Sequence, residues 1–183
     1  MLVHTIGHSR RSAAELFDLL RESRIELVAD VRRFPRSRTN PQFNAEALAP
    51  FLSERGMQYR HLPSLGGRRS STSSAPSSNT LWRVAAFRAY ADYAEGPEFR
   101  GGFDELMRLA ERRRVAIMCA EAVWWQCHRR IVADYLIAAG VEVRHILAAG
   151  KVEPATLTEG ATLSGGGRLS YRNPADPARL PGL

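Results

Sequence analysis

The segment MCAEAVWWQCHRR contains both cysteines of the chain, together with other side chains that can do chemistry. Cys119 and Cys127 supply thiols, Glu121 supplies a carboxylate, and His128 and Arg129 directly follow the second thiol. We expect Cys127 to lie in the first turn of a helix, where the helix amino end and nearby positive charge would lower the pKa of its thiol. Cys127 is therefore the candidate nucleophile.

The other residues of this segment each allow more than one interpretation. Cys119, at the end of a predicted buried strand, could be a second reactive thiol or a small apolar filler of the core. Glu121, close to Trp124 and Trp125, could have a raised pKa and act as a general acid, or could be a solvated loop residue. The two tryptophans could cap the core or stack on a base or sugar. His128 could be a base, an anion ligand or a plain surface histidine.

The cysteine spacing bears on known kinds of thiol site. A tyrosine-phosphatase loop needs an arginine six residues after the cysteine, but Trp125 and Ala133 occupy those positions, so this kind of site is excluded. A thioredoxin-type pair has two residues between its cysteines. Seven separate Cys119 from Cys127, so a redox pair would need the loop to bring the two thiols together.

A zinc site could use Cys119, Cys127 and His128, with His61 or His8 as a fourth ligand. Neighbouring residues on a helix diverge by about 100°, which makes joint ligation by Cys127 and His128 awkward. We therefore expect no cofactor, and a metal bound by the two cysteines and a histidine stays open as the alternative.

Composition describes an ordinary soluble domain with an unusual basic charge. The chain has 183 residues and a formal net charge of +7, and Lys151 is its only lysine, so arginine supplies the other basic side chains. This skew could reflect nucleic-acid or phosphate binding, a solvated basic surface, or codon usage in a GC-rich genome. No apolar run is long enough for a membrane span and the start lacks a secretory layout, so we expect no membrane association, a cytoplasmic location and reduced thiols.

Hydrophobic periodicity predicts alternating strands and helices. The expected strands cover residues 2–6, 25–31, 57–62, 115–120 and 141–147. The expected helices cover residues 13–23, 45–56, 81–96, 103–114 and 126–140. Ser12 and Glu15 have capping-box spacing, and Asn44 is a candidate cap of the second helix, whose interior contains Pro50.

This alternation indicates an α/β fold: a single domain with a mainly parallel open sheet of about five strands and helices on both faces. We assign residues 1–147 to this α/β domain and residues 148–183 to a C-terminal extension that packs on it or trails from it, with a small hairpin around 165–167. Residues 66–80, rich in glycine and serine, are expected to be a disordered loop or a lid.

The reactive side chains follow successive strands of this predicted sheet. Parallel α/β sheets place their sites beyond the carboxyl ends of the strands. We therefore predict one site in which Cys127, Cys119, Glu121 and His128 are catalytic, and Asp30 could orient an arginine or histidine. The predicted substrate-binding residues are His8, Ser9, Asp30, Arg32, Ser37, His61, Gly66, Gly67 and Arg129.

Motifs at these strand ends resemble a bacterial and archaeal family catalogued as domain of unknown function 488. The resemblance rests on TIGHS, DVRRFPRSR, YRHLPSLGG, FRAYADY and MCAEAVWWQCHRR, in that order, over residues 5–146. The serine-rich loop looks longer than is usual in the family. The resemblance implies an α/β domain with a thiol-containing site, and it implies no particular reaction.

These observations favour a thiol-dependent hydrolase or transferase that acts on an anionic substrate, such as a nucleotide, a nucleic acid or another phosphate-bearing molecule. A non-catalytic nucleotide or nucleic-acid binding module would use the same arginines and tryptophans. A metal or redox thiol protein is the third hypothesis.

Overall fold

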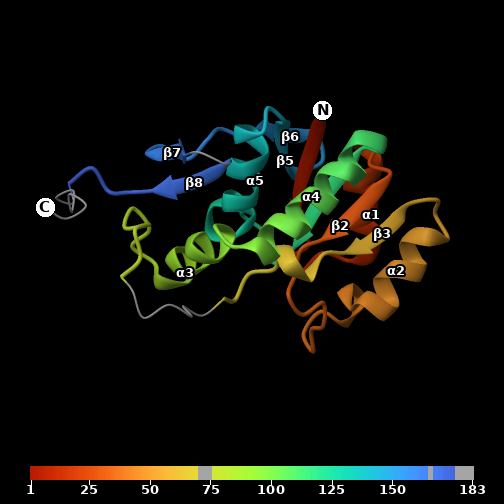
Figure 1. Cartoon of the computed structure of the whole chain (residues 1–183). Coiled ribbons are helices and arrows are strands. Elements are labelled where there is room, and N and C mark those ends of the chain that lie inside the picture. The colour runs from red at the N-terminus through yellow and green to blue at the C-terminus, as the bar shows by residue number, and fades with distance from the viewer. Residues whose placement is uncertain (70–75, 165–166, 176–183) are drawn as a thin grey trace, which may run out of the picture.

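Strands predicted from hydrophobic periodicity pair in a sheet with helices on both faces, as expected for an α/β fold (Figure 1). Within residues 1–69, 76–164 and 167–175, which the computed structural model describes, six strands form this sheet in the order β3-β2-β4-β1-β5-β6. They are β1 (Leu2–Gly7), β2 (Leu27–Asp30), β3 (Gln58–His61), β4 (Val115–Cys119), β5 (Glu142–Ala148) and β6 (Lys151–Pro154).

The sheet is parallel except at one edge. β4 lies between β1 and β2 and is buried along its whole length, as its uninterrupted apolar sequence predicts. β6 pairs antiparallel with β5 and was not predicted. A short connection containing Gly150, whose φ is +65°, reverses the chain there, because glycine adopts this conformation without steric cost.

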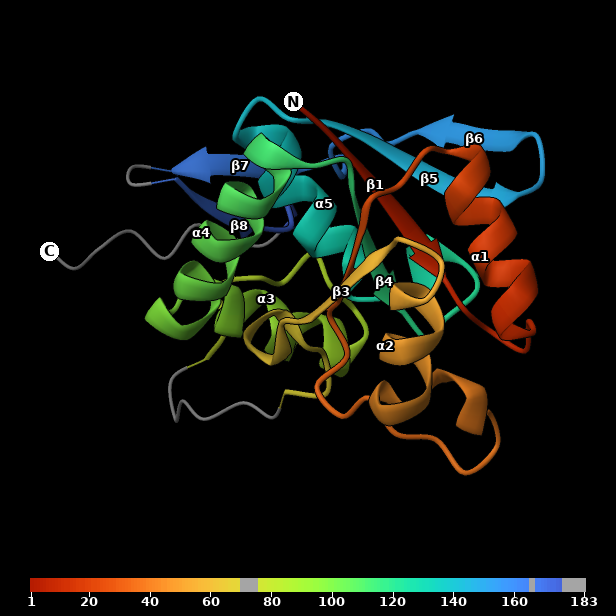
Figure 2. The same cartoon turned by 90° about the vertical axis from the view of Figure 1, so that its right-hand side faces the viewer.

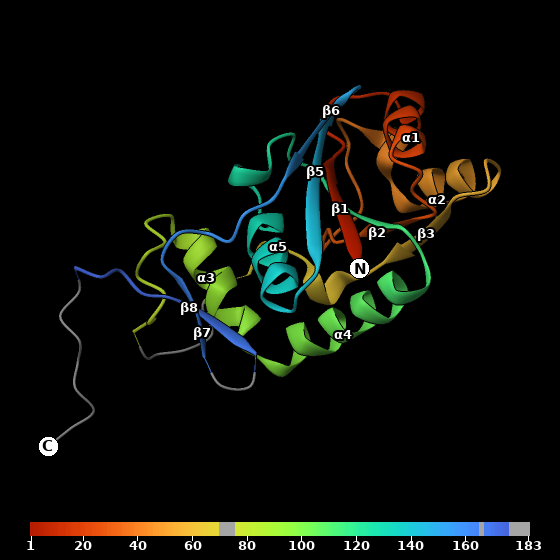
Figure 3. The ribbon, with the colours of Figure 1, turned by 90° about the horizontal axis from the view of Figure 1, so that it is seen from above.

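Helices cover the two faces of the sheet (Figure 3). On one face, α1 (Ala13–Glu22) and α2 (Ala45–Ser53) pack their leucines in one apolar cluster. On the other face, α3 (Ala85–Ala94), α4 (Pro97–Arg112) and α5 (Arg129–Ala138) contribute to a second cluster. In the described part of the chain, none of the helices combines the length and apolarity that crossing a lipid bilayer requires.

Local signals explain where two helices begin. The predicted capping box is present: Ser12 Oγ accepts a hydrogen bond from Glu15 N, and Ser12 N donates to the Glu15 carboxylate. Asn44 precedes α2, but its side chain accepts a hydrogen bond from Ser37 N and does not cap the helix. Pro50 lies inside α2, and the helix ends at Ser53, earlier than predicted.

The chain after residue 154 contains the predicted hairpin strands. β7 (Ala161–Ser164) and β8 (Arg168–Tyr171) pair antiparallel, and residues 165–166 between them lie outside the described residues. The hairpin lies beside α5 (Figure 2), where the Tyr171 hydroxyl donates to Asp134 at 2.9 Å. This contact attaches the hairpin to the domain.

Part of the predicted loop over 66–80 is ordered. Residues 70–75 lie outside the described residues, so the prediction of disorder or a lid is not addressed there. After them, Asn79 is fully buried: its side chain donates to Asp92 and accepts from Tyr171 N.

A close packing contact positions the 3-10 turn that precedes Gly67. α4 begins at Pro97, before the predicted residue 103, and so includes Gly101 and Gly102. A side chain at Gly102 would overlap Ser64, in the 3-10 turn η2 (Pro63–Leu65), whereas Gly101 faces open space. Gly102 therefore lets η2 approach α4, and Tyr90 and Tyr93 hold the turn by donating to the carbonyl oxygens of Leu65 and Ser64.

Alanine substitution should distinguish these neighbouring glycines. Gly101→Ala should raise the free energy of unfolding by about 1 kcal/mol, because alanine favours the helix. Gly102→Ala should lower it, because the added methyl group would lie 3.0 Å from Ser64 Cβ. Urea denaturation measures both values, and an equal gain for the two variants would contradict this packing.

Candidate functional site

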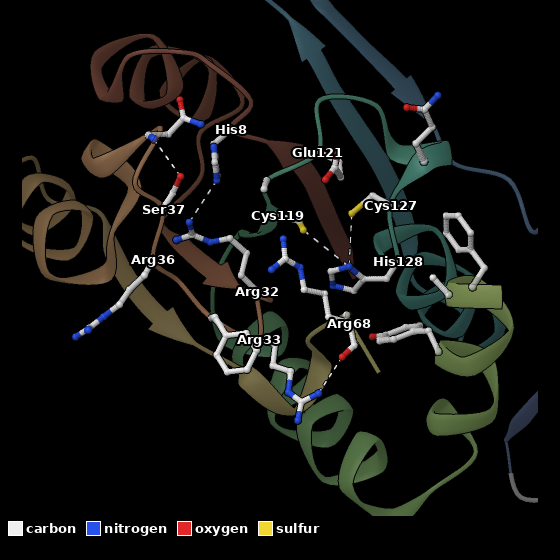
Figure 4. Close-up of a pocket in the computed structure, with 18 residues that line it drawn as sticks. His8, Arg32, Arg33, Arg36, Ser37, Arg68, Cys119, Glu121, Cys127 and His128 are labelled. Carbon is white, nitrogen blue, oxygen red and sulfur yellow. Dashed lines mark hydrogen bonds between the residues drawn. The ribbon is translucent and has the colours of Figure 1, made fainter. Parts of the chain in front are cut away.

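A cavity of about 380 Å³ opens at the carboxyl ends of β1, β2 and β4 (Figure 4). Some of the predicted site residues line it: His8, Arg32, Ser37, Gly67, Cys119, Glu121, Cys127 and His128. The others do not line it: Ser9, Asp30, His61, Gly66 and Arg129. The structure therefore brings catalytic candidates from distant segments to one cavity. Several of the predicted binding residues do not line this cavity.

Cys127 does not lie in the first turn of α5, so this prediction is wrong. The 3-10 turn η3 (Trp124–Gln126) precedes Cys127, whose backbone is extended with φ −128° and ψ 144°, and α5 begins only at Arg129. Because Cys127 is not helical, the expected divergence from His128 does not occur. His128 Nδ1 lies 3.7 Å from Cys127 Sγ and 3.8 Å from Cys119 Sγ.

The His128 ring is oriented by its second nitrogen. Nε2 lies 3.0 Å from the carbonyl oxygen of Val31, which can only accept, so Nε2 carries a hydrogen. In the neutral ring Nδ1 then has a lone pair facing the two sulfurs. Gly67 packs against this ring, since a Cβ there would lie 2.7 Å from Nδ1. His128 is therefore placed to take a proton from a thiol or to bind a metal.

Arg129 supports the thiols from behind the cavity. It is 1% exposed; its Nε donates to Cys127 Sγ at 3.3 Å, and its Nη2 donates to the carbonyl oxygen of Glu121 at 2.6 Å. Gly7 makes room for this arrangement, because a Cβ there would overlap the Glu121 carbonyl oxygen and lie 2.9 Å from Arg129 Nη2. Gly7 was not among the predicted site residues, although a glycine directly after the predicted strand over residues 2–6 was the available signal.

The two thiols have opposite electrostatic environments. Burial opposes ionisation of Cys127, but the hydrogen bond from Cys119 and the neighbouring His128 and Arg129 outweigh it and hold the pKa of Cys127 well below its usual value. The hydrogen bond to Cys127, together with burial, raises the pKa of Cys119 well above its usual value. The pair therefore favours a thiolate at Cys127 and a neutral thiol at Cys119.

On the opposite side of the cavity, Arg32 lines the wall and forms a buried ion pair with Asp30 behind it. Asp30 is 0% exposed and Arg32 is 6% exposed, and Arg32 Nε donates to the Asp30 carboxylate at 2.9 Å. Tyr59 donates to the same carboxylate at 2.6 Å, and Arg32 Nη2 donates to the carbonyl oxygen of Phe43. Asp30 thus fixes the guanidinium of Arg32 as a rigid positive charge at the cavity wall.

His8 completes this wall as a neutral ring. Its Nε2 lies 3.3 Å from Arg32 Nη1, which can only donate, and its Nδ1 lies 2.9 Å from the carbonyl oxygen of Ser9. Burial is the largest influence and lowers the pKa of His8 to about 4. His8 therefore accepts a hydrogen bond from Arg32 and is unprotonated at neutral pH.

Three other predicted binding residues act as supports. His61 Nε2 lies 2.8 Å from the carbonyl oxygen of Arg32, and Ser9 N donates to the carbonyl oxygen of Ala120. A Cβ at Gly66 would lie 2.6 Å from the backbone of Arg33, so glycine is needed for this close approach. These contacts tie neighbouring strand ends together.

Arginines that were not predicted as site residues also line the cavity. Arg33 and Arg36 belong to the motif DVRRFPRSR and Arg68 directly follows YRHLPSLGG, but the sequence did not indicate which arginines face inward. The Arg68 side chain extends over the cavity toward the thiols, and its carbonyl oxygen accepts a hydrogen bond from Arg33 (Figure 4). Figure 4 shows the Arg36 side chain pointing away from the cavity, and it pairs with Glu46, so Arg32, Arg33 and Arg68 supply the positive charge of the lining.

The remaining residues of the cysteine segment separate into different environments. Glu121 lines the cavity and its side chain is exposed. Trp124 stacks on His145 with ring centroids 4.5 Å apart, whereas Trp125 is 47% exposed. The two tryptophans therefore do not share one role.

The ligand atoms of Cys119, Cys127 and His128 all lie within 4.8 Å of one another, which is close enough for a shared metal ion. The hydrogen bond from His128 Nε2 to a backbone carbonyl is also typical of a metal-binding histidine. Neither predicted fourth ligand joins this group, because both ring nitrogens of His8 have other partners and His61 does not line the cavity. These residues fit a three-ligand site with an open position.

Removing the Asp30 carboxylate should destabilise the fold strongly. Asp30→Ala leaves the buried Arg32 charge unpaired, which should lower the free energy of unfolding by about 3–5 kcal/mol. Asp18→Ala is the matched control, because Asp18 pairs with Arg21 on an exposed helix surface and should contribute little. Similar losses for the two variants in urea denaturation would show that the buried pair is not specially important.

Alkylation should separate the two cysteines. The lowered pKa of Cys127 keeps its thiolate present at neutral pH and loses it only as pH falls, whereas Cys119 ionises only as pH rises well into the alkaline range. Iodoacetamide should therefore label Cys127 first at neutral pH, as peptide mass spectrometry would measure. The urea-unfolded protein, in which both should react alike, is the control. Equal or reversed labelling of the folded protein would contradict the assignment.

Comparison with known proteins agrees with the motifs at the strand ends. The chain has no significant match among curated proteins or solved structures. A family model described as Domain of unknown function DUF488 matches residues 12–136, a span that includes the Asp30–Arg32 pair, both cysteines and His128. The chain therefore belongs to the DUF488 family.

Proposed function

We propose that the chain is a thiol-dependent hydrolase or transferase that acts on an anionic, phosphate-bearing substrate, with Cys127 as its nucleophile. The position of Cys127 Sγ is the observation that supports this most. It lies 3.7 Å from His128 Nδ1 and accepts a hydrogen bond from Arg129 Nε, in the wall of a cavity lined by arginines. A thiol beside a base and a buried positive charge is the usual arrangement of an activated cysteine.

The cavity arginines would bind the substrate before reaction. Arg32 cannot rearrange freely because Asp30 holds it, so it supplies a fixed charge, whereas Arg33 and Arg68 are more exposed. Planar guanidinium groups match phosphate oxygens in pairs. Arg68 reaches toward the thiols and would bring the phosphate group near Cys127 (Figure 4).

The proposed first step transfers the phosphoryl group to sulfur. Cys127 reacts as the thiolate, its proton having passed to His128 Nδ1 before the substrate binds, and its sulfur forms a bond to phosphorus. The bond between phosphorus and the leaving oxygen breaks with its electron pair, and His128 returns the proton to that oxygen. Cys119 stays a neutral thiol and stabilises the Cys127 thiolate through its hydrogen bond.

The second step releases the phosphoryl group. The oxygen of water, or of an acceptor hydroxyl, forms a bond to phosphorus while Cys127 leaves as a thiolate. The proton of the attacking oxygen passes to His128. Glu121, which lines the same cavity, is the other group placed to accept it.

A zinc-dependent reaction is the second candidate, because Cys119, Cys127 and His128 place their ligand atoms within 4.8 Å. Zinc would supply Lewis-acid chemistry when bound. Elemental analysis of the purified protein, combined with thiol titration, distinguishes the two candidates. About one zinc ion per chain, with both thiols protected, supports the zinc-dependent reaction. Two titratable thiols without metal support Cys127 as the nucleophile.

Phosphate should protect Cys127, and Cys127→Ser should abolish turnover. Inorganic phosphate should slow the alkylation of Cys127 in the native protein. Arg68→Gln should weaken that protection, whereas Arg112→Gln, at the exposed end of α4, should not.

With a panel of phosphate monoesters, Cys127→Ser should lower kcat at least about 10³-fold without changing the circular dichroism spectrum.

Other results would decide against the proposal. Full turnover by Cys127→Ser would remove the nucleophile assignment. Phosphate binding that falls steeply with salt, without turnover of any ester by the native protein, would instead favour a non-catalytic binding module.

A further inference from the structure

A second cavity of about 420 Å³ adjoins the thiol cavity, and Phe87 of α3 lines both. The loop between β4 and α5 also serves both cavities, since Gln126 lines the first and Trp125 the second. Val84, which is 57% exposed, forms another part of the second cavity. A ligand bound at the thiols could therefore extend past Phe87 onto an exposed apolar surface.

We propose that this second cavity binds the base of a nucleotide whose phosphate occupies the thiol cavity. The inference rests on the proposed function, because it extends the same substrate from its phosphate to its base. It assigns the substrate to the class of nucleoside monophosphates, either free or as the phosphorylated end of a nucleic-acid strand.

Trp125 is the stacking surface in this proposal. Its indole is 47% exposed and meets Trp124 edge to face at 5.5 Å between ring centroids. Trp124 in turn stacks on the buried ring of His145. Trp125 therefore offers a broad apolar surface on a supported loop, and stacking on such a ring suits any base.

The charges of the second cavity suit the same ligand. The Arg130 guanidinium lies 5.0 Å from the Trp82 ring centroid, and its Nε donates to Thr158 Oγ1 at 2.9 Å. Arg83 also lines the cavity, and Glu159 supplies one carboxylate that could accept a hydrogen bond from a base amino group. The second cavity is aromatic and mostly positive, and it lies beside the arginine-lined thiol cavity. This arrangement suits a ligand that has an aromatic base at one end and a phosphate at the other.

The test compares the binding of AMP and ribose 5-phosphate by calorimetry, because ribose 5-phosphate keeps the sugar and phosphate and carries a hydroxyl group in place of the base. The native protein should bind AMP about tenfold more tightly than ribose 5-phosphate. Trp125→Ala should remove this preference and Trp125→Phe should restore most of it. Leu163→Ala, at an exposed apolar position on β7, is the matched control and should keep the preference.

Equal binding of AMP and ribose 5-phosphate by the native protein would overturn the proposal, and so would a preference that survives in Trp125→Ala. Protection of Cys127 from iodoacetamide keeps this outcome separate from the proposed function. If ribose 5-phosphate protects Cys127 but AMP binds no better, only the base site is lost. If neither ligand protects Cys127, the phosphate site itself is wrong.

An additional arm distinguishes the two sources of the nucleotide. A 5′-phosphorylated oligonucleotide that binds more tightly than AMP, with a preference that also depends on Trp125, supports a strand end as the ligand. Tighter binding of AMP supports the free nucleotide.

Discussion

The contact between His128 and the two cysteine sulfurs is the interaction on which this site depends. Nδ1 can face Cys119 and Cys127 only because Nε2 is held by the carbonyl oxygen of Val31, at the end of the neighbouring strand. Arg129 Nε then donates a hydrogen bond to Cys127 Sγ. This asymmetry makes two chemically identical thiols unequal, because Cys127 accepts hydrogen bonds that favour its thiolate while Cys119 is the hydrogen-bond donor.

Parallel packing of the strands, together with close backbone approaches, makes this contact possible. β1, β2 and β4 end side by side, so residues distant in sequence meet beyond them. Gly7 allows Arg129 to hold the loop after β4, and Gly67 allows the chain after β3 to pack on the His128 ring. On the other wall, Asp30 holds Arg32. The cavity therefore combines a reactive sulfur with fixed positive charge, which is what capture and attack of an anion both require.

Much of the fold and part of the site could be predicted from the sequence. Hydrophobic periodicity located the five parallel strands, and the position of polar residues after them located the edge where Cys119 and His128 meet. The start of α5 could not be predicted, because the 3-10 turn at Trp124 shifts the helix beyond Cys127 and has no distinct hydrophobic period. β6 was missed because all its residues are exposed, so no apolar alternation marks it.

The arginines show a different limit of sequence-based prediction. Arg32 and Arg33 are adjacent, yet one is buried against Asp30 and the other is exposed and bonded to the carbonyl oxygen of Arg68. Similarly, His61 follows its strand like the other candidates, but it supports Arg32 and does not line the cavity. Residue type and position along a strand do not fix such roles, since they depend on which neighbour takes each hydrogen bond.

The most direct test of the account is a titration of thiolate ultraviolet absorbance against pH in the native, reduced protein. We predict one thiolate per chain at neutral pH, lost when Cys127 is replaced, and a second that develops only in strongly alkaline solution. Two thiols that ionise together near the ordinary cysteine pKa would contradict the central claim that the neighbours of Cys127 and Cys119 divide the pair into a thiolate and a thiol.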